Sequence, residues 1–149
     1  MLNLVYPVFA FAKNGEITCF DTLASLETFV QITTDKNENG IITISKPNLS
    51  KLIFVEQADN SGYIAKKIDA FHLKDAGKYT VTYQDLNYDN YLSCGFEVYA
   101  GEPNSEESQV TIEGSNVAMA NGEDEVKIKV TLKDEDGNPI PNYSLTFVP

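Results

Sequence analysis

The residues best suited to chemistry in this 149-residue chain are one histidine and two cysteines. His72 lies in the apolar run Phe71-His72-Leu73, with no serine or cysteine close to it in sequence. A Ser-His-Asp triad could assemble only across the fold, and a lone histidine in a strand is usually a packing or surface residue. The sequence contains no glycine-rich phosphate loop, no HExxH motif and no pair of catalytic carboxylates. We therefore predict no catalytic residue, no cofactor and no enzyme activity.

The two cysteines, Cys19 and Cys94, lie far apart, and neither has a second cysteine beside it. They cannot form the several bridges of a disulfide-rich domain, and zinc would need further Cys or His ligands. We expect both thiols to be reduced and half-buried, with pairing between them as the open alternative.

Two segments rich in Asp and Asn resemble cation loops. Residues 35–40, Asp-Lys-Asn-Glu-Asn-Gly, match the opening of a calcium loop, but Lys46 occupies the twelfth position, where the loop requires a carboxylate. Residues 134–138, Asp-Glu-Asp-Gly-Asn, are equally typical of a turn. We predict no metal site; the first segment is interpreted as a hairpin turn on Asn39-Gly40 and the second as a turn with a weak cation site as the alternative.

The net charge of −11 excludes several classes of partner. An acidic surface repels nucleic acid and anionic lipid. The apolar stretch at residues 1–12 has no basic region, is interrupted by Pro7 and is shorter than the ~20 residues of a membrane-spanning helix. We expect no nucleic-acid partner, no membrane insertion and no signal peptide.

Apolar and polar residues alternate along almost the whole chain, and turn signals recur about every 8–12 residues, which predicts an all-β sandwich. One segment, Asp21–Gln31, could instead be a short helix, in competition with a strand at Phe29–Thr34. The predicted strands are Leu4–Phe11, Glu16–Phe20, Phe29–Thr34, Ile41–Ser45, Lys51–Gln57, Tyr63–Leu73, Lys78–Gln84 and Leu92–Ala100.

A polar segment divides the chain. Residues 101–108 contain Gly, Pro and three carboxylates but no large apolar side chain, as expected of a linker. We predict a first domain at residues 1–100, a linker at 101–108 and the beginning of a second domain at 109–149.

Within the first domain, Asp75-Ala76-Gly77-Lys78-Tyr79 resembles the corner that leads into strand F of immunoglobulin-like (Ig-like) domains. The resemblance implies that the Tyr79 hydroxyl binds the backbone of the corner. It also implies no disulfide at the usual place, because Val81 occupies the position of the strand-F cysteine. Bacterial and phage sandwiches commonly share this pattern.

Residues 109–149 resemble the first half of the bacterial Ig-like domain of group 1, the repeated module of invasin and intimin stalks. The resemblance rests on Ala120-Asn121-Gly122, on the alternating segment Val126–Leu132, on Lys133-Asp134-x-x-Gly137-Asn138-Pro139-x-Pro141, and on a following strand at Leu145-Thr146-Phe147. The module's later strands have no counterpart before Pro149. We expect either that the chain continues or that a neighbouring subunit supplies strands.

A cluster of tyrosines with Asp and Asn resembles a recognition loop, because Tyr gives contact area at low entropic cost. It also fits a plain hairpin. The candidate partner contacts are Tyr83, Tyr88, Asp89 and Tyr91.

These features predict an all-β, Ig-like structural protein of a bacteriophage virion, as a capsid decoration, head-fibre or tail component. Its first domain would bind other virion subunits, the second would project, and it could form a homo-oligomer or contact host glycans. The alternative is a stalk fragment of a bacterial surface adhesin of the invasin and intimin type, which would place the chain on the cell surface.

Overall fold

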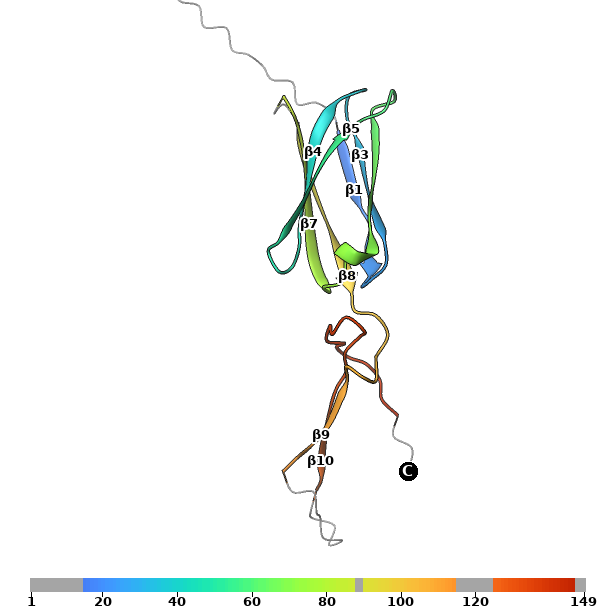
Figure 1. Ribbon diagram of the computed structural model, residues 1–149, viewed down its shortest axis with the longest axis vertical. Helices are drawn as coiled ribbons and strands as arrows, with labels where there is room; N and C mark the ends of the chain where they lie inside the picture. The colour runs from blue at the N-terminus through green and yellow to red at the C-terminus, as the bar shows by residue number, and fades with distance from the viewer. Residues whose placement is uncertain (1–14, 88–89, 115–124, 147–149) are drawn as a thin grey trace, which may run out of the picture.

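The computed structural model of the chain describes residues 15–87, 90–114 and 125–146. Its strands form two facing sheets, followed by a separate hairpin that projects along the long axis of the molecule (Figure 1). The predicted strand Leu4–Phe11 lies outside the described residues. No helix in the described part is long and apolar enough to span a membrane.

The first sheet has three antiparallel strands. β3 (Thr28–Thr33) lies in the middle and pairs with β1 (Glu16–Cys19) and with β6 (Tyr63–Ile68). Val30 and Ile32 of β3 are fully buried and alternate with more exposed neighbours. This period-two pattern is the reason that one face of the sheet lines the core.

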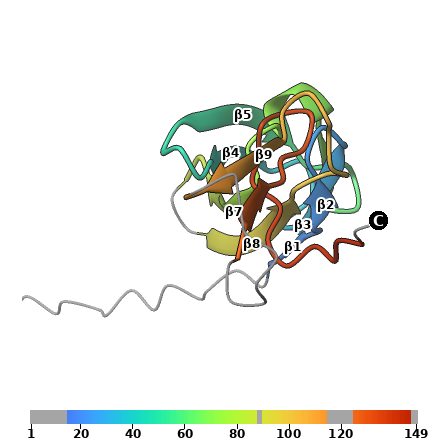
Figure 2. The same ribbon diagram turned by 90° about the horizontal axis from the view of Figure 1, so that it is seen from below.

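The second sheet has five strands in the order β2-β8-β7-β4-β5. β4 (Asn39–Ser45), β5 (Lys51–Gln57), β7 (Gly77–Asp85) and β8 (Tyr91–Tyr99) are antiparallel, and β2 (Thr22–Leu23) joins β8 in parallel. Because β1 belongs to the first sheet, the chain crosses between the sheets after β1. Figure 2 shows β5, β4, β7 and β8 around one side of the cross-section and β1 and β3 on the other.

The core lies between the sheets and is made almost entirely of aliphatic and aromatic side chains. The Tyr79 and Phe96 rings stack at a centroid distance of 5.0 Å. The fully or nearly fully buried apolar residues are Val30, Ile32, Ile42, Ile44, Ala58, Ile64, Ile68, Leu73, Tyr79, Val81, Tyr83, Phe96 and Val98.

A disulfide between Cys19 and Cys94 joins the two sheets, with a Cα–Cα distance of 6.0 Å. The expectation that both thiols are reduced is therefore wrong. β1 and β8 lie on facing sheets, and both cysteine side chains pack against the core. Residues far apart in sequence thus come within bonding distance.

The corner before β7 has the geometry that the sequence predicts. The Tyr79 hydroxyl donates a hydrogen bond of 3.0 Å to the carbonyl oxygen of Asp75. Gly77 has a φ of +135°, in the range that favours glycine, and packs against Pro47. Two facing sheets, a bridge between them and this tyrosine corner identify an Ig-like sandwich.

Two predicted elements differ from the structure. The segment Asp21–Gln31 is not a helix: it contains β2, a turn at Ser25 with φ of +59° and the start of β3. The predicted strand Tyr63–Leu73 ends at Ile68, and a 3-10 turn, η1 (Ala70–His72), follows. His72 is consequently outside any strand.

The prediction of a hairpin turn on Asn39-Gly40 is also wrong. β3 and β4 belong to different sheets, so residues 34–38 form a crossing loop rather than a hairpin turn. Gly40 lies within β4, where a Cβ atom would be 2.2 Å from Cε2 of Tyr83. Glycine is therefore required at this position by close packing.

The separate hairpin consists of β9 (Gln109–Glu113) and β10 (Lys127–Thr131). Pairing of Val110 with Val130 and of Ile112 with Ile128 places all four apolar side chains on one face. Residues 140–146 form no strand, so the strand predicted at Leu145 is absent from the described residues, and Phe147 and Asn121-Gly122 lie outside them.

Candidate functional site at the base of the sandwich

The segment Asp134–Asn138 forms a tight loop directly below the sandwich. The Gly137 N–H donates to the Asp134 carbonyl oxygen at 3.0 Å, and the Asp134 N–H donates to the Asn138 carbonyl oxygen at 3.0 Å. Gly137 has a φ of +82°. The predicted turn is thus confirmed, and we refer to Asp134–Asn138 as the joint loop.

Asp134 organises the joint loop. Its side chain is nearly buried, at 2% exposure. Its carboxylate accepts hydrogen bonds from the backbone N–H groups of Gly101 (2.9 Å), Asp136 (3.1 Å) and Asn138 (2.8 Å). Burial raises the pKa of Asp134, but bonds from Asn138, Gly101 and Asp136 together hold that pKa below its usual range. The ionised carboxylate therefore ties the joint loop to the end of β8.

Asn138 binds the joint loop to the tyrosine corner. Its side-chain N–H₂ group donates to the carbonyl oxygen of Lys74 (2.7 Å) and to the carboxylate of Asp134 (2.8 Å). Its side-chain oxygen accepts from the N–H of Ala76 at 2.8 Å. The side-chain amide of Asn138 thus satisfies two backbone groups that flank Asp75, the carbonyl oxygen of Lys74 and the N–H of Ala76.

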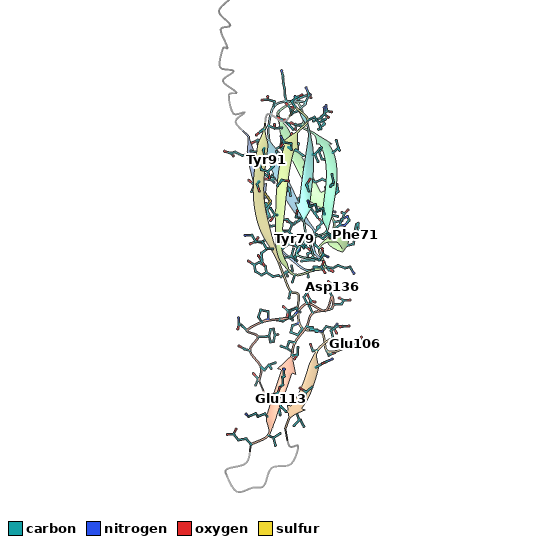
Figure 3. The ribbon with its side chains drawn as sticks, turned by 90° about the vertical axis from the view of Figure 1, so that its left-hand side faces the viewer. Phe71, Tyr79, Tyr91, Glu106, Glu113 and Asp136 are labelled. Atoms are coloured by element: carbon teal, nitrogen blue, oxygen red, sulfur yellow. A yellow bond between two sulfur atoms is a disulfide. The ribbon has the colours of Figure 1, made fainter. Side chains whose placement is uncertain are left out.

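Asp136 adds a second contact to the sandwich. Its carboxylate accepts a hydrogen bond of 2.6 Å from the Ser25 hydroxyl, in the turn between β2 and β3. The Lys74 ammonium lies 3.5 Å from the same carboxylate. The ion pair contributes little because Lys74 is exposed, so the hydroxyl contact is the more specific one. Figure 3 shows Asp136 beneath the end of the sandwich that carries Tyr79 and Phe71.

The predicted linker also takes part in the joint. The N–H of Asn104 donates to the carbonyl oxygen of Lys133 at 2.8 Å, and the Ser108 hydroxyl accepts from the N–H of Lys133 at 3.1 Å. The Asn104 side chain accepts from the N–H groups of Glu106 and Glu107, which fixes a turn. Residues 101–108 are therefore a hydrogen-bonded part of the joint rather than a free spacer.

The joint loop and its contacts form a shallow depression and a set of hydrogen bonds, and they bring no reactive side chains together. An open depression of about 500 Å³ lies beside it, lined among others by Leu23, Leu26, Pro103 and Asp136. Within residues 15–87, 90–114 and 125–146, no three His, Cys, Asp or Glu side chains are placed to hold a metal ion. The polar side-chain atoms of Asp134 and Asn138 form hydrogen bonds with backbone N–H groups and with a backbone carbonyl oxygen. The arrangement is suited to fixing an orientation.

The candidate partner contacts fall into three groups. Tyr83 is fully buried at 0% exposure, with its ring over Gly40, so its assignment as a partner contact is wrong. Tyr91 is 64% exposed and lies at the far end of the sandwich from the joint (Figure 3), and its role as a contact stays a prediction. Tyr88 and Asp89 lie outside the described residues.

His72 lies in the 3-10 turn at the base of the sandwich. Its ring is 3.7 Å from that of Phe71, centroid to centroid, and Phe71 is exposed. No described serine or cysteine thiol forms a hydrogen bond with it, and both cysteines are consumed by the disulfide. Among the residues that the structure describes, His72 therefore has no activated nucleophile beside it.

The joint contacts were not predicted from the sequence. Asp134 and Asn138, four residues apart around a glycine, predict a loop that closes on itself. Their partners Gly101, Lys74 and Ala76 lie up to 64 positions earlier, and no local pattern identifies them.

The sequence matches no family model and no curated protein. Among solved structures, the fold resembles a tetra-tandem repeat in the extending region of a large adhesion protein, with a TM-score of 0.50 and 17% identity, over 83% of this chain and 39% of that one. The chain therefore spans well under half of that structure. The Ig1 domain of mouse SynCAM 2 aligns over 57% of this chain and 94% of its own, at 13% identity and a TM-score of 0.34. Only the first likeness bears on the fold, and it supports the Ig-like sandwich.

Proposed function

We propose that the chain is a non-enzymatic structural protein that holds an Ig-like sandwich and a following module in a fixed orientation. The observation that carries this proposal is the joint. Asn138 binds both sides of the tyrosine corner, and Asp134 binds the end of β8. A flexible tether would need none of these contacts, because a Gly- and Ser-rich chain connects modules without them.

The fixed orientation is testable by comparing the two parts in solution. Backbone ¹⁵N relaxation should give one rotational correlation time for the sandwich and for β9 and β10. Substituting Asn138 with Ala should give the hairpin a shorter, independent correlation time, while Ser144→Ala, which changes an exposed Ser outside the joint loop, should leave it unchanged. Independent tumbling in the unaltered chain would contradict the proposal.

The first setting that we propose is a bacteriophage virion, as a capsid decoration, head-fibre or tail component. The domain at residues 1–100 would bind other virion subunits, and the module from residue 109 would project outward. Acidic net charge and a large exposed sheet suit such a particle surface, because they maintain solubility and leave a face for contact.

One observation favours the alternative, a stalk fragment of a bacterial surface adhesin. Disulfides such as Cys19–Cys94 persist outside the reducing cytoplasm, whereas virion proteins assemble within it. The tandem repeat of a large adhesion protein, which shares the fold, is consistent with this setting.

Immunogold labelling with antibodies against the sandwich distinguishes the two settings. Label on purified phage particles supports the virion role, and label on intact bacterial cells in the absence of phage supports the adhesin role. Label confined to the cytoplasm of unlysed cells would contradict both.

A further inference from the structure

β5 is the last strand at one edge of the five-stranded sheet, and its backbone bonds to β4 on one side only. Beyond one end of β5, the N–H of Ala58 donates to the carbonyl oxygen of Glu38 at 2.8 Å. Before the other end, the N–H of Lys46 donates to the carbonyl oxygen of Ser50 at 2.9 Å. Because the antiparallel register is unbroken between these two bonds, the even-numbered residues of β5 bond to β4. The backbone N–H and C=O groups of the odd-numbered residues point away from β4, and these residues are Lys51, Ile53, Val55 and Gln57.

The free side of β5 is open. No described strand lies beside it, and Figure 2 shows β5 at the margin of the cross-section. The side chains of Ile53 and Val55 are 64% and 68% exposed. Unpaired N–H and C=O groups along a sheet edge are a template for a further strand, and proteins commonly protect such edges with charges, prolines, bulges or short strands.

The other edges of the sandwich have protection that β5 lacks. β2 has two residues and β1 has four, so neither offers a long row of backbone groups. The edge strand β6 turns Lys66 toward the seam between the sheets, and an inward-pointing charge discourages strand addition. The Lys66 ammonium lies 2.6 Å from the carboxylate of Glu56 and 4.1 Å from the centre of the Phe54 ring, so it also neutralises the one carboxylate of β5. β5 has seven residues, no Pro or Gly, and no charge between Lys51 and Glu56.

The charges at the two ends of β5 indicate which strand would fit. Lys51 lies at the first end. The loops next to Gln57, at the second end, contain three carboxylates and one lysine, which are Asp35, Glu38, Asp59 and Lys36. A strand with a basic residue beside Gln57 and an acidic residue beside Lys51 gains attraction at both ends. A second copy of the chain is disfavoured, because two molecules that each carry −11 repel one another.

We propose that the free side of β5 binds an extended segment of another protein as an additional antiparallel strand. The segment is apolar and uncharged in its centre, basic at its N-terminal end and acidic at its C-terminal end, since antiparallel pairing places its N-terminal end beside Gln57. Hydrogen bonds between the two backbones supply the affinity, and the side chains set register and direction. The site belongs to the sandwich alone and does not depend on the orientation that the joint maintains.

A peptide based on β4, the strand that already pairs with β5, is the probe. It has the sequence of Asn39–Ser45 with Asn39→Lys and Ser45→Glu. At up to about 1 mM, a concentration that detects weak binding, the peptide should slow amide hydrogen exchange several-fold at Ile53 and Val55 of the full, disulfide-bonded chain. The N–H groups of Leu52 and Phe54 already bond to β4 and should not change. A peptide with the two charges exchanged should bind several-fold more weakly.

Backbone methylation of the peptide distinguishes strand addition from a contact between side chains. In the antiparallel register, the peptide residues Ile41 and Thr43 direct their N–H groups toward β5, and Ile42 and Ile44 direct theirs away. N-methyl groups on the first pair should abolish binding, whereas N-methyl groups on the second pair should be tolerated. Equal effects of the two methylated peptides would overturn the proposal.

Variants of β5 complete the test. Ile53→Pro removes one outward N–H and no bond to β4, so it should abolish binding. Ile53→Lys places a charge on the edge and should weaken binding even if the proline variant does not fold, whereas Ala65→Lys, at an exposed position of the edge strand β6, is the control and should not. Unchanged exchange at Ile53 and Val55 with about 1 mM peptide would overturn the proposal. So would a sedimentation mass of twice 16.5 kDa without peptide that Ile53→Lys returns to one chain, which would assign the edge to a second copy.

Discussion

Replacing Tyr79 with Phe removes one hydroxyl group and leaves the ring in place. The ring stacks on Phe96 and is fully buried, so core packing should be unchanged. The variant loses the hydrogen bond of 3.0 Å to the carbonyl oxygen of Asp75. A hydrogen bond of this kind contributes about 1 kcal/mol to the free energy of unfolding. At neutral pH we expect Tyr79→Phe to be less stable than the unaltered protein by that amount.

The difference in the free energy of unfolding between Tyr79→Phe and the unaltered protein should become smaller at alkaline pH. Burial, with a smaller contribution from the charge on Asp75, raises the pKa of Tyr79 from 10.0 to about 12. The folded protein therefore holds this proton more tightly than the unfolded chain does, and stability is lost as pH rises from about 10 to about 12. The full shift corresponds to a loss of about 2 kcal/mol near pH 12, and we take half of it because solvent near the corner screens the charge.

Guanidinium denaturation at about pH 8, 10 and 11.5 measures the free energy of unfolding of both proteins. The two values should differ by about 1 kcal/mol at about pH 8 and by close to zero at about pH 11.5. Tyr91→Phe is the control, because Tyr91 is 64% exposed and should change neither value. A gap between the unaltered protein and Tyr79→Phe that stays constant over this range would refute the argument that the buried hydroxyl titrates late.

Three further changes have defined outcomes. Reducing Cys19–Cys94, which closes a loop of 75 residues, should lower the free energy of unfolding by up to ~4 kcal/mol, measured by denaturation with and without reductant. Gly40→Ala should cost about 1–3 kcal/mol because the new methyl group meets the Tyr83 ring, and an additional Tyr83→Leu substitution should recover part of the loss in melting experiments. Asn138→Ala should increase amide hydrogen exchange at Ala76 and leave the melting temperature of the sandwich within a few degrees, since the joint contacts lie outside the core between the two sheets.

Alternation of apolar and polar residues was sufficient to predict most of the sandwich. β4 and β7 are nearly where the pattern places them, because each presents one row of side chains to the core. The pattern fails at Phe71-His72-Leu73, where Leu73 is buried but the chain has left the sheet. Alternation reports which side chains are buried, and it does not distinguish a strand from an extended turn that covers the core.

Tertiary contacts account for the remaining differences. The pairing of Cys19 with Cys94 depends on β1 and β8 facing each other, which no local pattern specifies. Tyr83 resembles its neighbour Tyr91 in sequence context, yet strand register turns the first into the core and the second outward. A shift of one residue would exchange their roles.

The disulfide has a mechanical consequence. β1 is the first described strand of the sandwich and β8 the last, so tension applied to the two ends of this domain enters near Cys19 and leaves near Cys94. The covalent bond carries that tension directly from one strand to the other. The chain between the two cysteines, whose sequence separation of 75 corresponds to about 250 Å of extended chain, cannot unravel under load. A pulled array of such modules would lengthen only through the segments that lie outside the bridge.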